Sequence, residues 1–166
     1  MSDIPFYIAE TDAPAKRRLL REGLRLFARQ GLSATSIREI AKAADCTNPA
    51  LYKHFRTKEA LALLLFERAY AELFGRLEAA VDAAAGFEAR LRAFLATYAA
   101  FHDAHPDATI FLTDTLPVFW PQVPATMRRR TILTLLRDLL AEGQREGRVG
   151  PGDLELRMVL VVGTLG

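Results

Sequence analysis

The sequence predicts an all-α protein, and three observations lead to this fold class. Apolar residues recur at steps of three and four along most of the chain, which is the period of an α-helix. Glycine, proline and small polar residues interrupt this pattern where helices would begin and end. The one β-like run, 159–162, has neighbours that keep the helical spacing. We expect a three-helix head at the N-terminus, followed by a bundle of further helices.

The N-terminal segment predicts an arm and one helix. Residues 1–13 lack a periodic pattern and are expected to be a loose arm. A helix is predicted over 14–30, because it carries an apolar stripe and Gly31 follows as a stop. The rest of its surface is basic and is either a solvated face or, for the first few residues, a surface near nucleic-acid phosphates. These basic residues are Lys16, Arg17, Arg18, Arg21, Arg25 and Arg29.

Residues 35–58 predict two short helices joined by a tight turn at 45–47. Ser36 is placed to cap the first helix, and Glu39, three residues later, completes a capping box. Asn48 and Pro49 open the second helix, since proline suits the first helical position. This second helix is too short and polar to contribute much core. A helix–turn–helix presents such a helix to the major groove of DNA.

A long helix is predicted over 58–84, with Thr57 as its cap. It spans about 40 Å at the usual rise per residue, so we expect it to join the head to the body. The predicted domains are therefore a helix–turn–helix domain at 1–58 and a helical domain at 59–166.

The body predicts several more helices. An amphipathic helix covers 88–102, and Pro106 starts another. The stretch 116–124 holds three prolines and is predicted as a loop or a broken helix. A further helix is predicted over 125–146, and Asp153 caps the last one.

Composition excludes several classes of protein. Apolar residues make up 51% of the chain, which excludes a disordered protein, and no apolar run reaches the about 18 residues of a membrane span. The N-terminus lacks the pattern of a signal peptide, and the single cysteine permits no internal disulfide. We therefore expect a cytoplasmic protein. Residues 1–58 carry 11 Lys and Arg against 6 Asp and Glu, whereas 59–166 carry 11 against 14, which favours a basic, DNA-contacting head.

Residues 15–62 resemble the DNA-binding motif of the tetracycline-repressor (TetR) family of transcriptional regulators. The remainder resembles that family only in length, helicity and order of helices. The resemblance implies a homodimer on a pseudo-palindromic operator in double-stranded DNA, and a ninth helix that this chain is expected to lack. The shared features are Gly31, Thr35-Ser36, Ile40-Ala41, Leu51-Tyr52, His54-Phe55 and Lys58-Glu59-Ala60-Leu61.

The resemblance also implies which residues contact DNA. It places Tyr52 and Lys58 at phosphates, whereas the alternative for Tyr52 and His54 is packing against the first helix. Asparagine suits an adenine edge and lysine suits guanine, although Asn48 is alternatively the helix cap. Leu51 and Phe55 are expected to be core anchors. The predicted DNA-binding set is Thr35, Ser36, Arg38, Thr47, Asn48, Pro49, Ala50, Tyr52, Lys53, His54 and Lys58.

Large aromatic residues are frequent in the body, where they form core or line an apolar pocket. The resemblance implies a small, apolar effector bound among the body helices, and prolines around Trp120 would leave room for it. The predicted ligand-binding set is Phe66, Tyr70, Phe74, Phe94, Tyr98, Phe101, His102, Phe111 and Trp120.

The remaining histidine, cysteine and clustered arginine residues have simple structural interpretations. The pair His102 and His105 has metal-ligand spacing but lies at a helix terminus, where histidine caps carbonyls. Cys46 is expected to pack rather than to sense redox state, and 128–130 is either a solvated arginine cluster or an anion site. No catalytic signature is present, so we expect no catalytic residue, metal or cofactor.

These observations predict a ligand-responsive, DNA-binding transcriptional regulator, most simply a repressor that an apolar molecule releases from its operator. Dimerisation is expected through 132–140 and 154–165, which are rich in apolar residues. The alternative is an all-helical interaction or enzyme module whose helix–turn–helix is purely structural.

Overall fold

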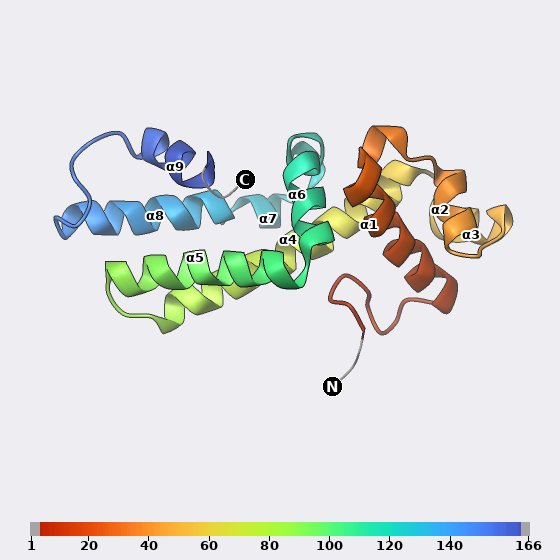
Figure 1. Cartoon of the computed structure of the whole chain (residues 1–166), viewed down its shortest axis with the longest axis horizontal. Coiled ribbons are helices and arrows are strands. Elements are labelled where there is room, and N and C mark those ends of the chain that lie inside the picture. Colours follow the sequence, from red (N-terminus) through yellow and green to blue (C-terminus); the bar gives the residue numbers. More distant parts are fainter. Residues whose placement is uncertain (1–3, 164–166) are drawn as a thin grey trace. The chain divides into compact units, whose positions relative to one another are not determined.

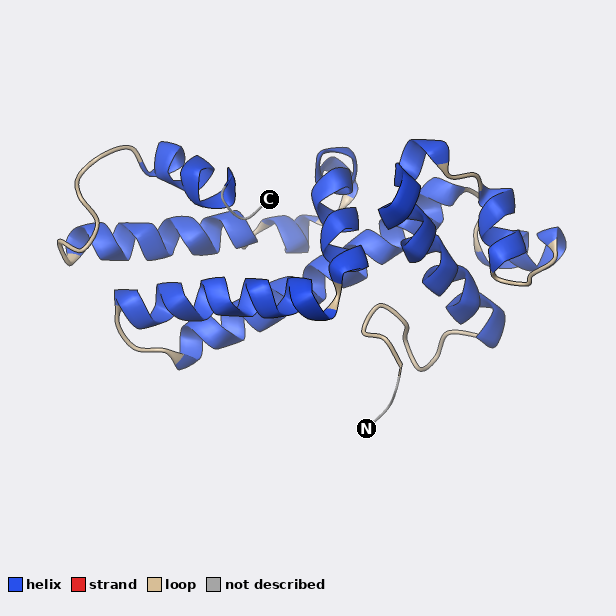
Figure 2. Ribbon diagram, in the orientation of Figure 1, coloured by secondary structure: helices blue, strands red, loops and turns tan. Residues whose placement is uncertain are grey.

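The computed structural model describes residues 4–163, with side chains described as far as Met158 in the last helix. All regular structure in this part of the chain is helical (Figures 1 and 2), which confirms the all-α prediction. None of the described helices is long and apolar enough to cross a bilayer. The helices are α1 (Pro14–Ala34), α2 (Ile37–Ala43), α3 (Asn48–His54), α4 (Lys58–Ala83), α5 (Phe87–Ala104), α6 (Pro106–Phe119), the 3-10 helix η1 (Trp120–Gln122), α7 (Ala125–Arg128), α8 (Ile132–Arg145) and α9 (Leu154–Gly163).

The chain divides into two compact units. Unit 1 combines Met1–Glu72 with Phe101–Val123, and unit 2 combines Leu73–Ala100 with Pro124–Gly166. Helices α4 and α5 each contribute to both units. Unit 1 therefore holds the predicted head together with the first part of α4 and all of α6.

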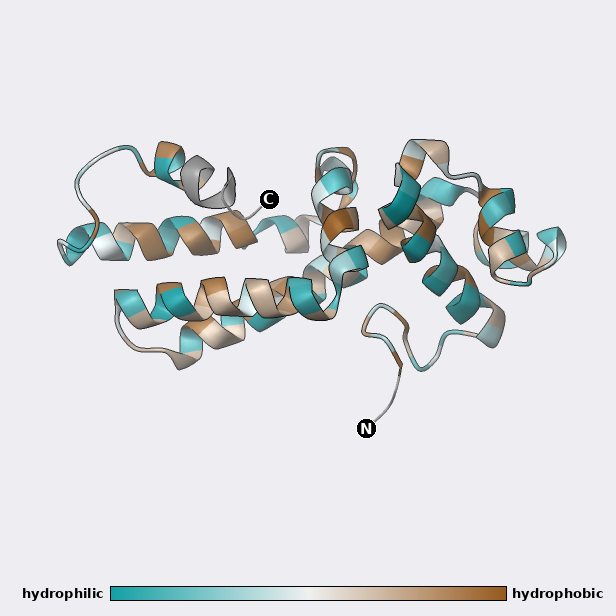
Figure 3. Ribbon diagram, viewed as in Figure 1, coloured by the Kyte–Doolittle hydropathy of each residue, from teal (hydrophilic) through white to brown (hydrophobic). Residues whose placement is uncertain are grey.

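The core of unit 1 forms where α1 packs against α2, α3 and α6. Leu20 and Phe27 of α1 are almost fully buried, and the Phe27 ring stacks on Phe111 of α6 with centroids 5.6 Å apart. Figure 3 shows polar and apolar residues alternating along these helices, as expected for helices with one buried face. The apolar stripe predicted from the sequence of the first helix is confirmed.

Residues 4–13 of the N-terminal arm are ordered, so the prediction of a loose arm is wrong for this segment. Ile8 is only 5% exposed, and the Phe6 ring lies 5.5 Å from Phe101 and 4.9 Å from His105. Backbone turns close at Ile8 and Asp12, whose amides donate to the carbonyls three residues earlier. The arm has no helical or strand period because single apolar residues and turns hold it, and such contacts leave no pattern in the sequence.

Two predicted breaks in the helical pattern, at Gly31 and at 116–124, are found in the structure. The chain leaves helical geometry at Gly31, with φ of +81°, as predicted, because glycine adopts this conformation without strain. Of the two alternatives predicted for 116–124, a loop or a broken helix, the structure shows the broken helix: α6 continues through Pro117 to Phe119, and the 3-10 helix η1 follows. Phe119 is 1% exposed, and burying its ring favours the extra helical turn.

The predicted helix at 125–146 is two helices, so that prediction is wrong. Thr131 has extended backbone geometry and caps α8, because its hydroxyl accepts from the Thr134 amide at 3.0 Å. The Thr134 hydroxyl in turn accepts from the Thr131 amide at 2.7 Å. This reciprocal pair is a capping box with threonine in place of glutamate, and it starts a new helix after the arginine cluster.

Unit 2 buries most of the apolar side chains of α8. Four leucines of that helix face the interior, whereas Leu133 is 47% exposed. Helix α9 lies along α8 (Figure 1) and carries Leu156, which is 62% exposed. The predicted dimerisation segment 132–140 is therefore mostly internal packing, and the side chains of 159–165 lie outside the described residues. The four internal leucines are Leu135, Leu136, Leu139 and Leu140.

Candidate nucleic-acid interface

The first helix of the motif begins at the predicted capping box. The Ser36 hydroxyl accepts from the Glu39 amide at 3.2 Å, and the Glu39 carboxylate accepts from the Ser36 amide at 2.7 Å. Hydrogen bonding of the Glu39 carboxylate to the Ser36 side chain and to the Ser36 amide lowers the pKa of the Glu39 carboxyl. Ile40 and Ala41 are buried, so α2 is fixed to the core on one face and leaves Ser36 and Arg38 exposed.

The turn between α2 and α3 has a fixed geometry. Asp45 has a φ of +49°, a left-handed conformation that aspartate tolerates better than most residues. The Cys46 amide donates to the Ala41 carbonyl at 2.9 Å. Arg18 of α1 donates to the Ala44 carbonyl at 2.9 Å and lies 3.6 Å from the Cys46 sulfur. Cys46 is half-buried in this packing.

Helix α3 is capped by Thr47, whose hydroxyl accepts from the Ala50 amide at 3.4 Å. The alternative in which Asn48 is the cap is therefore wrong, and Asn48 and Pro49 occupy the first two helical positions. Leu51 is 1% exposed and Phe55 is 5% exposed, which confirms both as core anchors. They hold α3 against the head with its opposite face outward.

The outward face of α3 carries most of the residues predicted to bind DNA. Tyr52 is 49% exposed, which argues against the alternative that it packs against α1. Ala50 and His54 are half-buried, and the exposed residues of the set are Thr47, Asn48, Pro49, Tyr52 and Lys53, with Ser36 and Arg38 on α2. The structure therefore brings nine of the eleven predicted residues together on one helix–turn–helix, and seven of the nine are exposed to solvent.

Thr35 is not part of this surface. It is 1% exposed, and its hydroxyl donates to the Gly31 carbonyl at 2.8 Å. A side chain that closes the break between α1 and α2 in this way is not available to DNA, so the predicted contact of Thr35 is incompatible with its burial.

Lys58 also differs from the prediction. Its ammonium donates to the carbonyls of Leu32 at 2.8 Å, Ser33 at 3.3 Å and Thr35 at 2.9 Å. A lysine has three donors, so this arrangement uses all of them on the end of α1 and leaves none for a phosphate. The carbonyl end of a helix is electronegative, which is why a cation settles there.

Several cations of α1 bind carboxylates or carbonyls of this chain, and this differs from the predicted position near phosphates. Lys16 pairs with Asp12 at 2.7 Å, and Arg25 pairs with Glu22 at 2.7 Å. Arg17 donates to the Asp12 carbonyl at 2.7 Å and also to the Glu10 carbonyl. The first few basic residues of α1 therefore stabilise the arm and the motif turn.

Arg56 is an exposed cation that our sequence reasoning did not select. It lies between α3 and Thr57, whose hydroxyl accepts from the Ala60 amide at 3.1 Å at the start of α4. Its position in the sequence directly after Phe55, a predicted core anchor at the end of a helix, could have indicated that the Arg56 side chain faces solvent.

The predicted ligand-binding residues do not form one cluster in one unit. Phe74, Phe94 and Tyr98 belong to unit 2, and the other six belong to unit 1. In unit 1 the Phe66 ring lies 5.9 Å from Tyr70 and 5.7 Å from Phe119. The buried members are Phe66, Tyr70, Phe94, Phe101 and Phe111; Phe74, Tyr98 and Trp120 are half-buried, and His102 is exposed.

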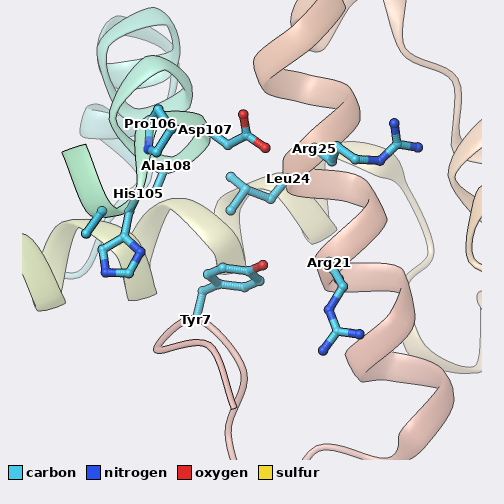
Figure 4. A pocket seen from close by; sticks show the side chains of 9 residues that line it. Tyr7, Arg21, Leu24, Arg25, His105, Pro106, Asp107 and Ala108 are labelled. Carbon is cyan, nitrogen blue, oxygen red and sulfur yellow. The ribbon is translucent and has the colours of Figure 1, made fainter. Parts of the chain in front are cut away.

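A pocket of about 300 Å³ lies in unit 1, and none of the predicted ligand-binding residues lines it. Figure 4 shows Tyr7, Leu24 and His105 around it. Burial raises the pKa of the Tyr7 hydroxyl, although the nearby Arg21 opposes this effect. The lining residues are Tyr7, Arg21, Leu24, Arg25, Ala104, His105, Pro106, Asp107 and Ala108.

The two histidines that were considered as a metal-binding pair, His102 and His105, lie in different environments. His105 packs its ring against Phe101 at 5.1 Å, whereas His102 points to solvent. The described residues contain no group of three or more potential metal ligands.

Comparison with known proteins points in the same direction as this geometry. Residues 19–65 match the family profile described as bacterial regulatory proteins, tetR family. Over 155 residues the chain is 32% identical to the HTH-type transcriptional repressor KstR2 of Mycolicibacterium smegmatis, covering 88% of this chain and 73% of that protein. It is also 43% identical over 63 residues to the HTH-type transcriptional regulator AcrR of Shigella flexneri, which is 38% of this chain and 29% of AcrR.

Solved structures share the fold. A bacterial regulatory protein in the tetR family from Rhodococcus RHA1 superposes with a TM-score of 0.80 at 22% identity, covering 93% of this chain and 82% of that one. The ketosteroid transcriptional regulator KstR2 of Mycobacterium tuberculosis superposes with a TM-score of 0.79 at 24% identity, covering 95% and 83%.

Proposed function

The chain belongs to the tetR family of bacterial regulatory proteins, and from this premise we propose that it represses transcription as a homodimer on a pseudo-palindromic operator. A regulator of chromosomal genes acts in the cytoplasm, so we place it there. In this proposal two copies set their α3 helices in successive major grooves, about one helical turn apart. A small apolar molecule then lowers the affinity for the operator.

The observation that carries this proposal is the outward face of α3. Tyr52 and Lys53 are exposed on a helix that Leu51 and Phe55 anchor from behind. A purely structural helix–turn–helix would not need polar, solvent-facing side chains on its second helix, so the alternative has less support. Because Thr47 caps α3, the side-chain amide of Asn48 is not used for capping. This amide group suits an adenine edge.

Selection of duplexes from a randomised pool tests the DNA-binding proposal. The parent protein is expected to enrich an inverted repeat. Lys53→Ala is expected to change the preferred base at one position of each half-site, at a cost of about 1–3 kcal/mol for the original sequence. Arg92→Ala is the matched control, since Arg92 is an exposed cation on α5 in unit 2. Recovery of identical sites by parent and Lys53→Ala would remove α3 as the reading helix.

The apolar effector is supported by aromatic residues within unit 1, where the half-buried Trp120 ring lies 5.1 Å from the ring of Tyr70, and by the relative named as a ketosteroid regulator. We expect a compound from a panel ranging from fatty acids to ketosteroids to release the selected duplex. Trp120 is the single tryptophan, and its emission should change with the same midpoint as the release. Tyr70→Ala should weaken both effects. Release that is unaffected by this variant and invisible to Trp120 would contradict the proposed site.

A further inference from the structure

Helix α4 is bound to the two ends of α1 by two of its own cations. At the C-terminal end of α1, the Lys58 ammonium donates to three carbonyls at 2.8–3.3 Å. These groups surround the break at Gly31, where helical hydrogen bonds are interrupted and carbonyls need other donors. Lys58 is thus the cap of a helix 26 residues earlier in the sequence.

At the other end of α1, Arg68 binds the N-terminal arm. Its guanidinium donates to the Asp12 carboxylate at 2.5 and 3.3 Å and to the Tyr7 carbonyl at 2.9 Å. The Asp12 side chain is 4% exposed and that of Arg68 is 23% exposed. A two-pronged contact of this kind fixes orientation as well as distance. Asp12 lies two residues before Pro14, the first residue of α1, so Arg68 holds the segment that leads into that end of the helix.

Between these contacts the two helices approach closely. A Cβ atom on Gly23 of α1 would lie 2.7 Å from the Leu61 Cδ2 atom, and Leu61 and Leu65 are fully buried. Lys58 and Arg68 are ten residues apart, which is about 15 Å along a helix. The start of α4 is therefore held to α1 at three levels, all of them within unit 1.

We propose that Lys58 and Arg68 are positioning residues for DNA binding, which join α1 and the start of α4 into one rigid body. This body carries α2 and α3, since both pack against α1. The two contacts set the orientation in which α3 meets the groove, and neither residue touches DNA. The proposal rests on the proposed function and assigns Lys58 a role different from a phosphate contact.

Salt dependence separates positioning from phosphate contact. Each neutralised phosphate contributes about 0.9 to the slope of log affinity against log salt concentration, so removing a contact lowers that slope. Loss of a positioning contact instead reduces the fraction of molecules in the binding-competent orientation. A fall of that fraction to about one tenth weakens affinity about tenfold at every salt concentration and leaves the slope unchanged.

The experiment measures binding of the parent-selected duplex to Lys58→Met and Arg68→Met between 50 and 200 mM KCl. We expect about tenfold weaker binding for each variant with parallel salt plots. Lys58→Arg and Arg68→Lys retain a donor and should recover part of the loss. Arg92→Met controls for removing a surface cation. A slope reduced by about 0.9 in Lys58→Met, or unchanged affinity in both variants, overturns the proposal.

A second measurement needs no DNA. Hydrogen exchange of the free protein should become faster at 32–39 in Lys58→Met and at 7–17 in Arg68→Met, while circular dichroism shows that both variants are folded. Unchanged exchange at these ends overturns the rigid-body proposal, even if the parent selects no duplex. Failure of the parent to select a duplex, by contrast, counts against the proposed function alone.

Discussion

Asp12→Asn is expected to lower the free energy of unfolding of unit 1 by about 3 kcal/mol at neutral pH, because it breaks a buried ion pair. The Asp12 carboxylate accepts from Arg68, from Lys16 at 2.7 Å and from the Ala9 amide at 2.9 Å. Asparagine keeps the size of the side chain but removes the charge. We place the loss at the low end of the range for buried pairs, since Lys16 and Arg68 keep 25% and 23% of their side chains exposed.

This contribution should depend on pH in a defined direction. The hydrogen bond from Arg68 is the main cause that holds the pKa of the Asp12 carboxyl well below its ordinary value of 3.8. A carboxyl with a lowered pKa in the folded state stabilises the protein above its unfolded pKa, and this stabilisation is lost as pH falls. The difference between parent and Asp12→Asn should therefore be constant from pH 7 to about 5 and shrink below about 4.

Urea unfolding followed by Trp120 emission measures this difference, since Trp120 lies in unit 1 and its ring is 5.1 Å from Tyr70. Asp103→Asn is the matched control, because Asp103 is an exposed aspartate of the same unit. The control should change stability little at any pH. A difference between parent and Asp12→Asn that persists unchanged at pH 3 would contradict this account of Asp12.

The local features of the motif could be predicted from the sequence, because each depends on residues three or four positions apart. The capping box of Ser36 and Glu39 and the anchors Leu51 and Phe55 belong to this class. The partners of Lys58 could not be predicted, since they lie 23 to 26 residues away and are backbone carbonyls. Every residue has a backbone carbonyl, so no sequence pattern identifies which carbonyl is the partner of a cation.

The arm was missed for a related reason. Arg68 and Asp12 are 56 residues apart, and a single charged pair at that distance is one among many possible pairs in a chain with 22 cations and 20 anions. The break before α8 was missed because Thr131 caps with Thr134 rather than with the glutamate or glutamine of the usual pattern. Both errors concern where polar groups find partners, and apolar periodicity does not carry that information.

Dimerisation is expected to depend on Leu133 of α8 and Leu156 of α9, which are exposed among the described side chains of unit 2. Burying a leucine side chain contributes about 1.5–3 kcal/mol, and a glutamate in the same place would add the cost of burying a charge. Leu133→Glu and Leu156→Glu should therefore each weaken the dimer by at least about tenfold to a hundredfold. Sedimentation over a range of micromolar concentrations measures this change.

The control for surface charge is Ile110→Glu, since Ile110 is 41% exposed on α6 in unit 1 and lies outside the expected interface. It should leave the dimer unchanged.

In the proposed mechanism a monomer reaches only one half-site, so the two leucine variants should also lose most of their affinity for the selected inverted repeat while keeping affinity for a single half-site. A parent protein that stays monomeric on the inverted repeat, or a dimer that only Ile110→Glu disrupts, would exclude pairing through α8 and α9. Loss of half-site binding in Leu133→Glu would instead indicate that the variant damages the fold, because the residues of α3 are far from it in sequence and belong to the other unit.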